Sequence, residues 1–166
     1  MKKITFLFVM LLCSTVSFAQ TNNLPGVLTV KDALSIYKNG FGEARSVLAE
    51  LDYDFYGYDD TANHWAKNCE YDNDKHKAVK FGKGTSSVIT VPAENSDVTI
   101  TVFNEAAFNK LKSQIIALGY KKTDSWGSSS GTYSELYTKQ GMPNITASND
   151  SAVNDLPYNI YIGNEM

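Results

Sequence analysis

The first regular pattern in the chain is an apolar stripe between Val30 and Leu51, in which hydrophobic residues recur at alternating steps of four and three. That spacing places them on one face of an amphipathic helix. The stripe keeps its phase across Asn39-Gly40-Phe41-Gly42, although each glycine inside a helix costs about 1 kcal/mol. The pattern therefore predicts one kinked helix or two short helices in line.

A second apolar stripe runs from Phe108 to Leu118 and predicts a second helix. Asn104 is placed to cap its N-terminus, and Glu105 lies near the positive end of its dipole. Gly119 can end the helix in a left-handed turn.

The two stripes are related by one constant offset along the chain. This offset superposes Phe41 on Phe108, Leu48 on Ile115, Leu51 on Leu118 and Tyr53 on Tyr120. These matches fit a duplicated unit of a helix followed by strands, and they also fit convergence of two helices that pack on one sheet. Half-repeats of this kind would span residues 29–103 and 104–166.

Strand-like runs, rich in β-branched and aromatic residues, fill much of the remaining chain. They lie at Tyr53–Tyr58, His64–Tyr71, Ala78–Phe81, Ser87–Val91, Val98–Phe103, Tyr120–Ser125, Tyr133–Lys139, Ile145–Ala147 and Tyr158–Ile162. Short connections such as Pro92–Asp97 and Gly127–Gly131 favour antiparallel pairing. The sequence predicts an α+β fold, with two helices on one face of a mostly antiparallel sheet of about seven to nine strands.

The N-terminus has the order of a bacterial secretory signal peptide. Lys2 and Lys3 precede an apolar run from Ile4 to Leu12, and a small-residue cleavage site follows at Ser17-Phe18-Ala19. A membrane anchor is the alternative, but the 15 residues from Ile4 to Phe18 are fewer than the roughly 20 that a spanning helix needs. We therefore expect cleavage after Ala19, no membrane insertion of the mature chain, and a periplasmic or extracellular location.

Removal of residues 1–19 changes the composition of the chain. A leader, 20–28, and a single domain, 29–166, remain, with 13 basic against 18 acidic residues and a net charge of about minus five. Nucleic acid and anionic lipid call for clustered Lys and Arg, so neither is an expected partner. Cys13 leaves with the signal peptide, which makes Cys69 a single thiol, either buried or paired with another molecule.

Two features of the chain resemble known proteins. The secretory N-terminus and the helix endings Leu51-Asp52-Tyr53 and Leu118-Gly119-Tyr120 resemble those of small secreted domains of unknown function from Gram-negative bacteria. The repeated helix-plus-sheet plan is similar to that of the beta-lactamase inhibitor protein family. The resemblance implies an architecture for most of the mature chain and assigns a role to no residue.

Acidic and aromatic residues gather between Asp52 and His76, which is where the sequence favours a site. Its carboxylates could hold a cation, with Asp72, Asp74 and His76 as candidate ligands, but their spacing matches no metal-binding loop. We therefore expect no metal and no other cofactor. A carboxylate-dependent hydrolase built from this region stays open as an alternative.

A thiol and an imidazole in the same region could form a nucleophilic pair. On one regular strand, His64 and Cys69 would point to opposite faces and could not meet. The chain also lacks the G-x-S-x-G and His-Glu-x-x-His motifs of hydrolases and a Gly-rich phosphate loop.

Aromatic side chains are the remaining candidates, because they contribute large rigid contact areas to interfaces. The candidate binding residues are Tyr56, Tyr58, Trp65 and Trp126. Strict alternation along Tyr53–Tyr58 places Tyr56 and Tyr58 together on one face, opposite Phe55. The leading hypothesis is a secreted, non-catalytic domain that binds a protein or a glycan, and a structural module of an envelope assembly is a further alternative.

Overall fold

The computed structural model describes residues 26–94, 96–129, 131–149 and 157–164, and it confirms the predicted α+β class. The predicted signal peptide lies outside the described residues. The described helices are α2 (Val30–Asn39), α3 (Phe41–Glu50) and α4 (Glu105–Ala117). None of these helices is long and apolar enough to cross a membrane.

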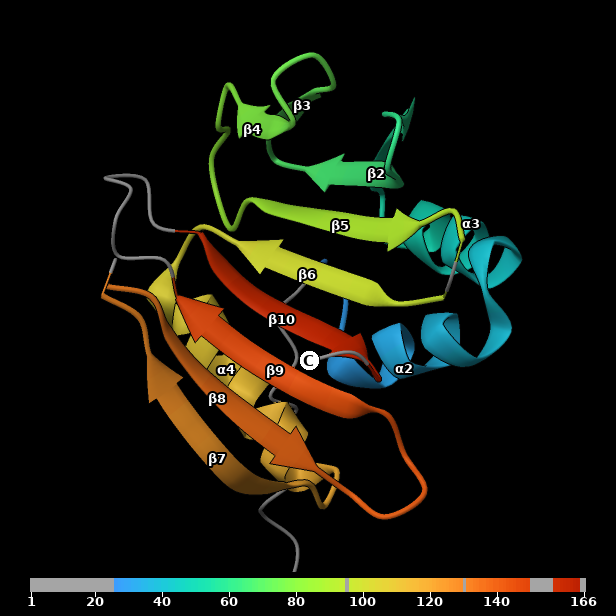
Figure 1. Ribbon diagram of the computed structural model, residues 1–166. Helices are drawn as coiled ribbons and strands as arrows, with labels where there is room; N and C mark the ends of the chain where they lie inside the picture. The colour runs from blue at the N-terminus through green and yellow to red at the C-terminus, as the bar shows by residue number, and fades with distance from the viewer. Residues whose placement is uncertain (1–25, 95, 130, 150–156, 165–166) are drawn as a thin grey trace, which may run out of the picture.

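The strands form one large antiparallel sheet and one hairpin. Their bounds are β1 (Asp54–Tyr58), β2 (Ala62–Lys67), β3 (Glu70–Asp72), β4 (Lys77–Val79), β5 (Ser87–Pro92), β6 (Val98–Val102), β7 (Lys121–Gly127), β8 (Tyr133–Thr138), β9 (Asn144–Asn149) and β10 (Tyr158–Gly163). Eight strands make the large sheet, in the order β1-β2-β5-β6-β10-β9-β8-β7 (Figure 1). β3 and β4 pair only with each other.

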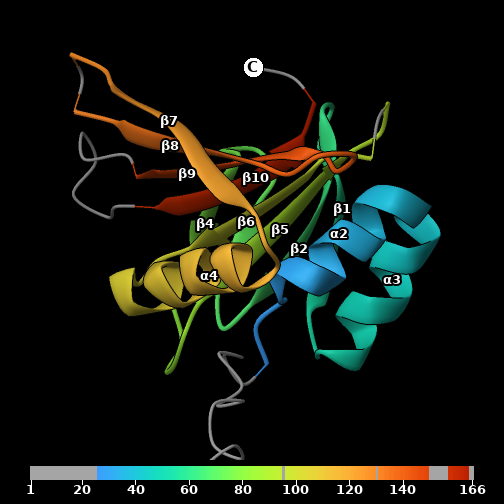
Figure 2. The same cartoon turned by 90° about the horizontal axis from the view of Figure 1, so that it is seen from below.

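The helices cover one face of the large sheet, as the sequence predicts (Figure 2). Between the two layers lies a core of fully buried side chains, among them Leu48, Leu111, Ile89, Ile100 and Ile160. The β3–β4 hairpin packs on the other face, beside β2 and β5, over a smaller cluster that contains Ala66, Cys69 and Val88. The rest of that face carries mostly short polar side chains, which is typical of the solvated side of an antiparallel sheet, with Leu136 and Tyr161 as larger exceptions.

The predicted kink in the first helix is a break at Gly40, whose φ of 77° separates α2 from α3. Glycine reaches positive φ without the steric cost that other residues meet. At the start of α2, the Thr29 side chain accepts a hydrogen bond from the N–H of Asp32, and Gln114 of α4 accepts one from the N–H of Val30 at 2.9 Å. Gln114 thus satisfies a backbone donor that the helix cannot satisfy and joins α2 to α4.

The predicted single strand His64–Tyr71 is wrong, because the chain turns at Asn68, which has a φ of 55°. β2 ends before this turn and β3 begins after it. Cys69 therefore packs beside Ala66 under the hairpin. Contrary to the prediction from the sequence, His64 and Cys69 therefore do not lie on opposite faces of one strand.

The predicted alternation along β1 is also wrong, because Tyr56 is the extra residue of a β-bulge. Phe55 is opposite Trp65 in the ladder, and Tyr58 is opposite Asn63. The two partners on β2 lie two residues apart and so point to the same face. Tyr58 therefore shares a face with Phe55 and not with Tyr56.

The strand order is symmetric about the central pair β6 and β10. α3 with β1, β2, β5 and β6 makes a first unit, and α4 with β7, β8, β9 and β10 makes a second unit. The central ladder pairs Ile100 with Ile160 and Val98 with Ile162. An exchange of the units that maps Val98 onto Ile160 and Ile100 onto Ile162 leaves this register unchanged.

The β-bulge occurs in both units. In β1 the register slips between Phe55 and Gly57, and in β7 it slips between Lys122 and Asp124. These positions are related by the same offset along the chain that superposes the helices. A bulge is a specific local feature, so its recurrence at the same place is a detail that topology alone does not require.

The helix ends are alike as well. Asp52 and Gly119, which follow the helices, have φ values of 57° and 86°. The next residues, Tyr53 and Tyr120, are both buried, and their N–H groups bond to carbonyl oxygens of the preceding helix at 2.9 and 3.3 Å.

A lysine on the second strand of each unit, or just after it, closes the helix end. Lys67 donates to the carbonyl oxygen of Leu51, and Lys139 donates to that of Leu118 at 2.7 Å. The two ammonium groups also lie over the buried tyrosine rings, at 5.8 and 5.9 Å from the centroids. The two units therefore share backbone conformation and side-chain contacts, and their origin by duplication stays a prediction.

Candidate functional site

The four predicted binding residues lie in different surroundings. Tyr58 and Trp126 are both exposed, but they belong to β1 and β7, the opposite edges of the large sheet. Tyr56 is half-buried against the cluster under the hairpin. Trp65 is buried in the main core and offers no surface to a partner. The structure therefore does not bring these four residues together.

Trp65 instead supports two exposed aromatic side chains. Its ring centroid lies 5.0 Å from that of Phe55 and 5.7 Å from that of Phe41, and the two phenylalanines lie 6.3 Å apart. Phe41 is 41% exposed and Phe55 is 50% exposed. The bulge adds Tyr58, which is 53% exposed, to the same face of β1. We call Phe41, Phe55 and Tyr58 the aromatic edge.

A hollow of about 330 Å³, the first hollow, opens beside the aromatic edge. Its lining residues come from the start of α3, from β2 and from the end of β5 with the turn that follows it: Phe41, Asn63, Val91, Pro92, Ala93, Glu94 and Ser96. Phe41 belongs to both features, and Asn63 is the cross-strand partner of Tyr58. The edge and the hollow therefore form one continuous surface, and the walls of the hollow are part apolar and part polar.

A cation borders this surface. The guanidinium carbon of Arg45 lies 6.0 Å from the ring centroid of Phe41. Among the residues that the structure describes, no carboxylate lies within ion-pair distance of Arg45.

A second hollow, of about 190 Å³, lies between α4 and the strands of the second unit. It is lined by Glu105, Phe108, Asn109, Lys112, Tyr133, Glu135, Ala147, Asn149 and Tyr158. The rings of Phe108 and Tyr158 pack against each other with centroids 5.0 Å apart. Phe108 is consequently only 7% exposed.

The second hollow contains an ion network around Glu135. This carboxylate accepts hydrogen bonds from Lys112 at 3.2 Å, Lys122 at 3.1 Å and the hydroxyl of Tyr137 at 2.9 Å. Burial acts to raise the pKa of Glu135, but these three donors lower it overall. Glu135 is therefore ionised at neutral pH and its charge is compensated within the protein.

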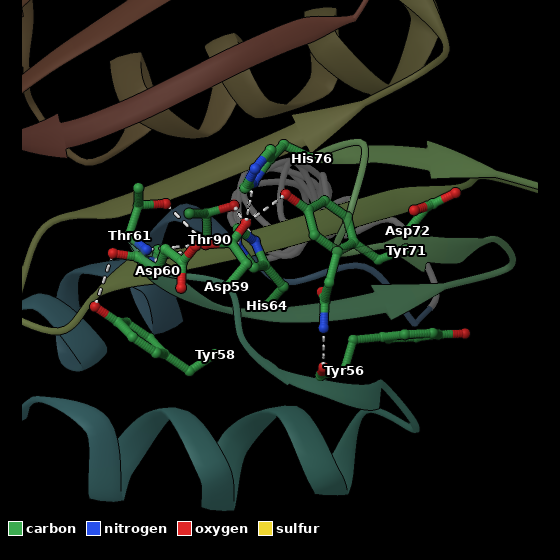
Figure 3. Close-up of polar contacts among 12 residues, drawn as sticks. Tyr56, Tyr58, Asp59, Asp60, Thr61, His64, Tyr71, Asp72, His76 and Thr90 are labelled. Carbon is green, nitrogen blue, oxygen red and sulfur yellow. Dashed lines mark hydrogen bonds and ion pairs between the residues drawn. The ribbon is translucent and has the colours of Figure 1, made fainter.

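A polar cluster lies where the β3–β4 hairpin folds against the large sheet (Figure 3). Oδ1 of Asp59 accepts hydrogen bonds from the hydroxyl of Thr61 at 2.8 Å and from the N–H groups of Thr61 and Ala62 at 3.2 and 3.1 Å. Oδ2 accepts from Nδ1 of His76 at 2.7 Å and from the hydroxyl of Tyr71 at 3.2 Å. One buried carboxylate thus joins the β1–β2 turn to β3 and to the residue before β4.

His64 completes the cluster. Its Nε2 lies 2.7 Å from Oδ2 of Asp59 without the alignment of a hydrogen bond, and its Nδ1 lies 3.1 Å from Oγ1 of Thr90. Burial lowers the pKa of His64, although Asp59 acts in the opposite direction, so the ring is neutral at neutral pH. Burial acts to raise the pKa of Asp59, but its donors, His76 first among them, lower it overall.

Thr90, His64 and Asp59 stand in the order of a nucleophile, base and acid, but their surroundings favour a structural role. Thr90 lies within β5, which pairs with β2 on one side and β6 on the other, so the nearby N–H groups serve the ladders and not an oxyanion. The lowered pKa of Asp59 keeps its carboxylate ionised, but its Oδ2 accepts hydrogen bonds from His76 and Tyr71. This oxygen has no aligned hydrogen bond with His64, so it does not orient His64 as a base. The cluster fastens the hairpin to the sheet.

The candidate metal ligands do not converge. Asp72 forms an ion pair with Lys75 at 2.7 Å, Asp74 is exposed in the hairpin turn, and His76 binds Asp59. Within the described ranges, no group of three His, Cys, Asp or Glu side chains could hold a metal ion.

The Cys69 thiol is buried and lies 3.5 and 3.7 Å from two backbone carbonyl oxygens. Burial raises the pKa of Cys69, which keeps the thiol protonated and a weak nucleophile.

Sequence reasoning missed Phe41 and Phe55 as surface residues. A local signal existed for Phe41, because glycines flank it on both sides and leave its ring uncovered by neighbouring side chains. No comparable signal marked Phe55, whose position next to Tyr58 depends on the bulge.

No protein-family model, curated protein or solved structure matches this chain. The resemblance to the beta-lactamase inhibitor protein family therefore gains no support from these comparisons. Function has to be argued from the site itself, because a fold shared in outline does not carry function with it.

Proposed function

We propose that the mature protein is a secreted, non-catalytic binding domain that contacts a protein partner through the aromatic edge and the first hollow. The observation that carries the proposal is the exposure of Phe41, Phe55 and Tyr58 next to a hollow whose walls are part apolar and part polar. Exposed aromatic groups beside a pocket are typical of the anchor positions at which interfaces concentrate their binding energy.

A protein is favoured over a glycan by the chemistry of the surface. Two of the three exposed rings are phenylalanines, which have no polar group to hydrogen-bond to a sugar hydroxyl. Pro92 and Ala93 add aliphatic surface to the hollow. Such a surface suits the burial of apolar side chains from a partner.

The rival hydrolase finds less support in the geometry. Asp59 is the most buried carboxylate of the acidic region, and its acceptor positions are taken by donors from the protein itself. A catalytic carboxylate must instead face substrate with its proton or lone pair free.

Capture of partners from the native envelope fraction tests the proposal. Immobilised mature protein, 20–166, is compared with Phe55→Ala and with Phe81→Ala. Phe81 is a matched control, because it is 47% exposed but lies outside the aromatic edge. We expect Phe55→Ala to lose a partner protein that Phe81→Ala retains. Equal recovery by all three forms would refute the proposed surface.

A further inference from the structure

The two hollows occupy equivalent places in the two units. The ladders pair Trp65 with Ile89 in the first unit and Tyr137 with Ile145 in the second. Tyr137 therefore corresponds to Trp65, because each lies two residues before the lysine that closes its helix end.

Residue correspondences follow from that register. A step of two residues back along β2 and β8 matches Asn63 with Glu135. The corresponding step of two residues forward along β5 and β9 matches Val91 with Ala147. Phe41 and Phe108 are matched by the offset that relates the two helical stripes, and so are Arg45 and Lys112. The ladders match Val98 with Ile160, and continuing two residues back, past the start of β6, places Ser96 at the position of Tyr158.

The hollows differ mainly at Ser96 and Tyr158. In the second unit the ring of Tyr158 packs on Phe108 at an interplanar angle of 31°, and Phe108 is buried. In the first unit Ser96 has no ring, so the matched face of Phe41 is open to solvent. The first hollow thus has Ser96 in its lining where the second hollow has the ring of Tyr158.

The charged groups beside the two phenylalanine rings differ as well. Lys112 lies 4.9 Å from the ring centroid of Phe108 and pairs with Glu135. Arg45 lies over Phe41 in the same way, but Asn63 stands where the second unit has its carboxylate. Glu94 also lines the first hollow, and it forms no ion pair with Arg45.

We propose that the first hollow accepts an aromatic side chain of the partner protein, with an acidic group beside it that pairs with Arg45. The partner would supply the two groups that the second unit holds internally, a ring in the position of Tyr158 and a carboxylate in the position of Glu135. This inference rests on the proposed function and names the chemistry of the partner at that site.

Small probes in an NMR titration of the labelled mature protein test this chemistry. 4-Hydroxyphenylacetate carries both groups, cyclohexylacetate lacks the aromatic ring, and 4-methylphenol lacks the acid. We expect 4-hydroxyphenylacetate to shift the signals of the Phe41 ring and the Asn63 side-chain amide, and to bind more tightly than either other probe. Equal shifts with cyclohexylacetate would overturn the choice of an aromatic group.

Two variants make the test specific to the site. Ser96→Tyr fills the hollow with a ring of the protein's own, and we expect it to weaken 4-hydroxyphenylacetate binding at least about tenfold. Arg45→Gln leaves the hollow open, and we expect it to abolish the advantage of 4-hydroxyphenylacetate over 4-methylphenol. Unchanged binding in both variants contradicts the inference, and the second variant keeps it testable if the first fails to fold.

Failure here is distinguishable from failure of the proposed function. If the probes bind nowhere near Phe41 while Phe55→Ala still loses a partner that Phe81→Ala retains, the binding surface stands and the assigned occupant is wrong. If neither experiment gives a difference, both proposals fail.

Discussion

The relation between the two hollows predicts that Ser96→Tyr will stabilise the protein, which is an uncommon result for a turn residue. The introduced ring would lie on Phe41 as Tyr158 lies on Phe108, where the centroids are 5.0 Å apart. The gain comes from covering a ring that is now exposed to water.

The size of the gain follows from exposure. Phe108 is 7% exposed and Phe41 is 41% exposed, so the new ring would cover roughly one third of Phe41. One third of the roughly 200 Å² of an aromatic side chain is about 70 Å², which is worth about 1.7 kcal/mol. The introduced ring buries a similar area and loses about 1 kcal/mol of rotamer freedom. The expected net gain in the free energy of unfolding is about 2 kcal/mol, or about 4–8 °C in Tm.

Urea unfolding of the mature protein measures this gain, and Phe41→Ala provides the control. In the Phe41→Ala background the introduced ring has no partner, so we expect most of the gain to disappear. A neutral or destabilising Ser96→Tyr, or an equal gain in both backgrounds, would refute the equivalence of the two hollows.

Three further predictions concern the helix ends and the polar cluster. Asp52→Gly should stabilise the fold by up to about 1 kcal/mol and Gly119→Ala should destabilise it by about 1 kcal/mol, because both positions have positive φ. Thermal unfolding measures both effects, and a destabilising Asp52→Gly or a stabilising Gly119→Ala would contradict the prediction. The lowered pKa of Asp59 means that its carboxylate stabilises the fold fully above the unfolded pKa of about 3.9, and that this stabilisation is lost as pH falls further. Asp59→Asn should therefore lower the free energy of unfolding by about 2 kcal/mol at pH 7. In urea titrations, the difference from wild type should shrink below about pH 4. The lowered pKa of His64 likewise means that stability is lost as pH falls below about 6.5, so His64→Gln should flatten the stability profile between about pH 7 and 5, and an unchanged slope would count against burial of the neutral ring.

Most of the layer plan was predictable, because helical stripes and strand-like runs report which faces are buried. The phase of the stripe across Gly40 predicted two collinear helices or a kink, and the structure has a break there. The turn at Asn68 was not predictable, because an asparagine in an apolar-polar run does not signal positive φ by itself. The same holds for the bulge at Tyr56, which depends on pairing with β2.

The candidate site was less predictable than the fold, because it depends on pairs of residues that are distant in sequence. Phe41 lines the first hollow together with Ser96, which lies in a turn between two later strands, and no local pattern connects the two. Asp59 and His76 meet only because the β3–β4 hairpin folds back on the sheet. The constant offset between the helices was visible in the sequence, but which unit lacks the internal ring was visible only in the structure.

The dissociation constant of the captured partner is the most direct test of the central claim, that the aromatic edge and the first hollow bind a protein. The comparison is between wild type, Phe55→Ala and Phe81→Ala, two substitutions of similarly exposed rings. We expect at least about tenfold weaker binding for Phe55→Ala and unchanged binding for Phe81→Ala. Equal constants for all three forms would contradict it.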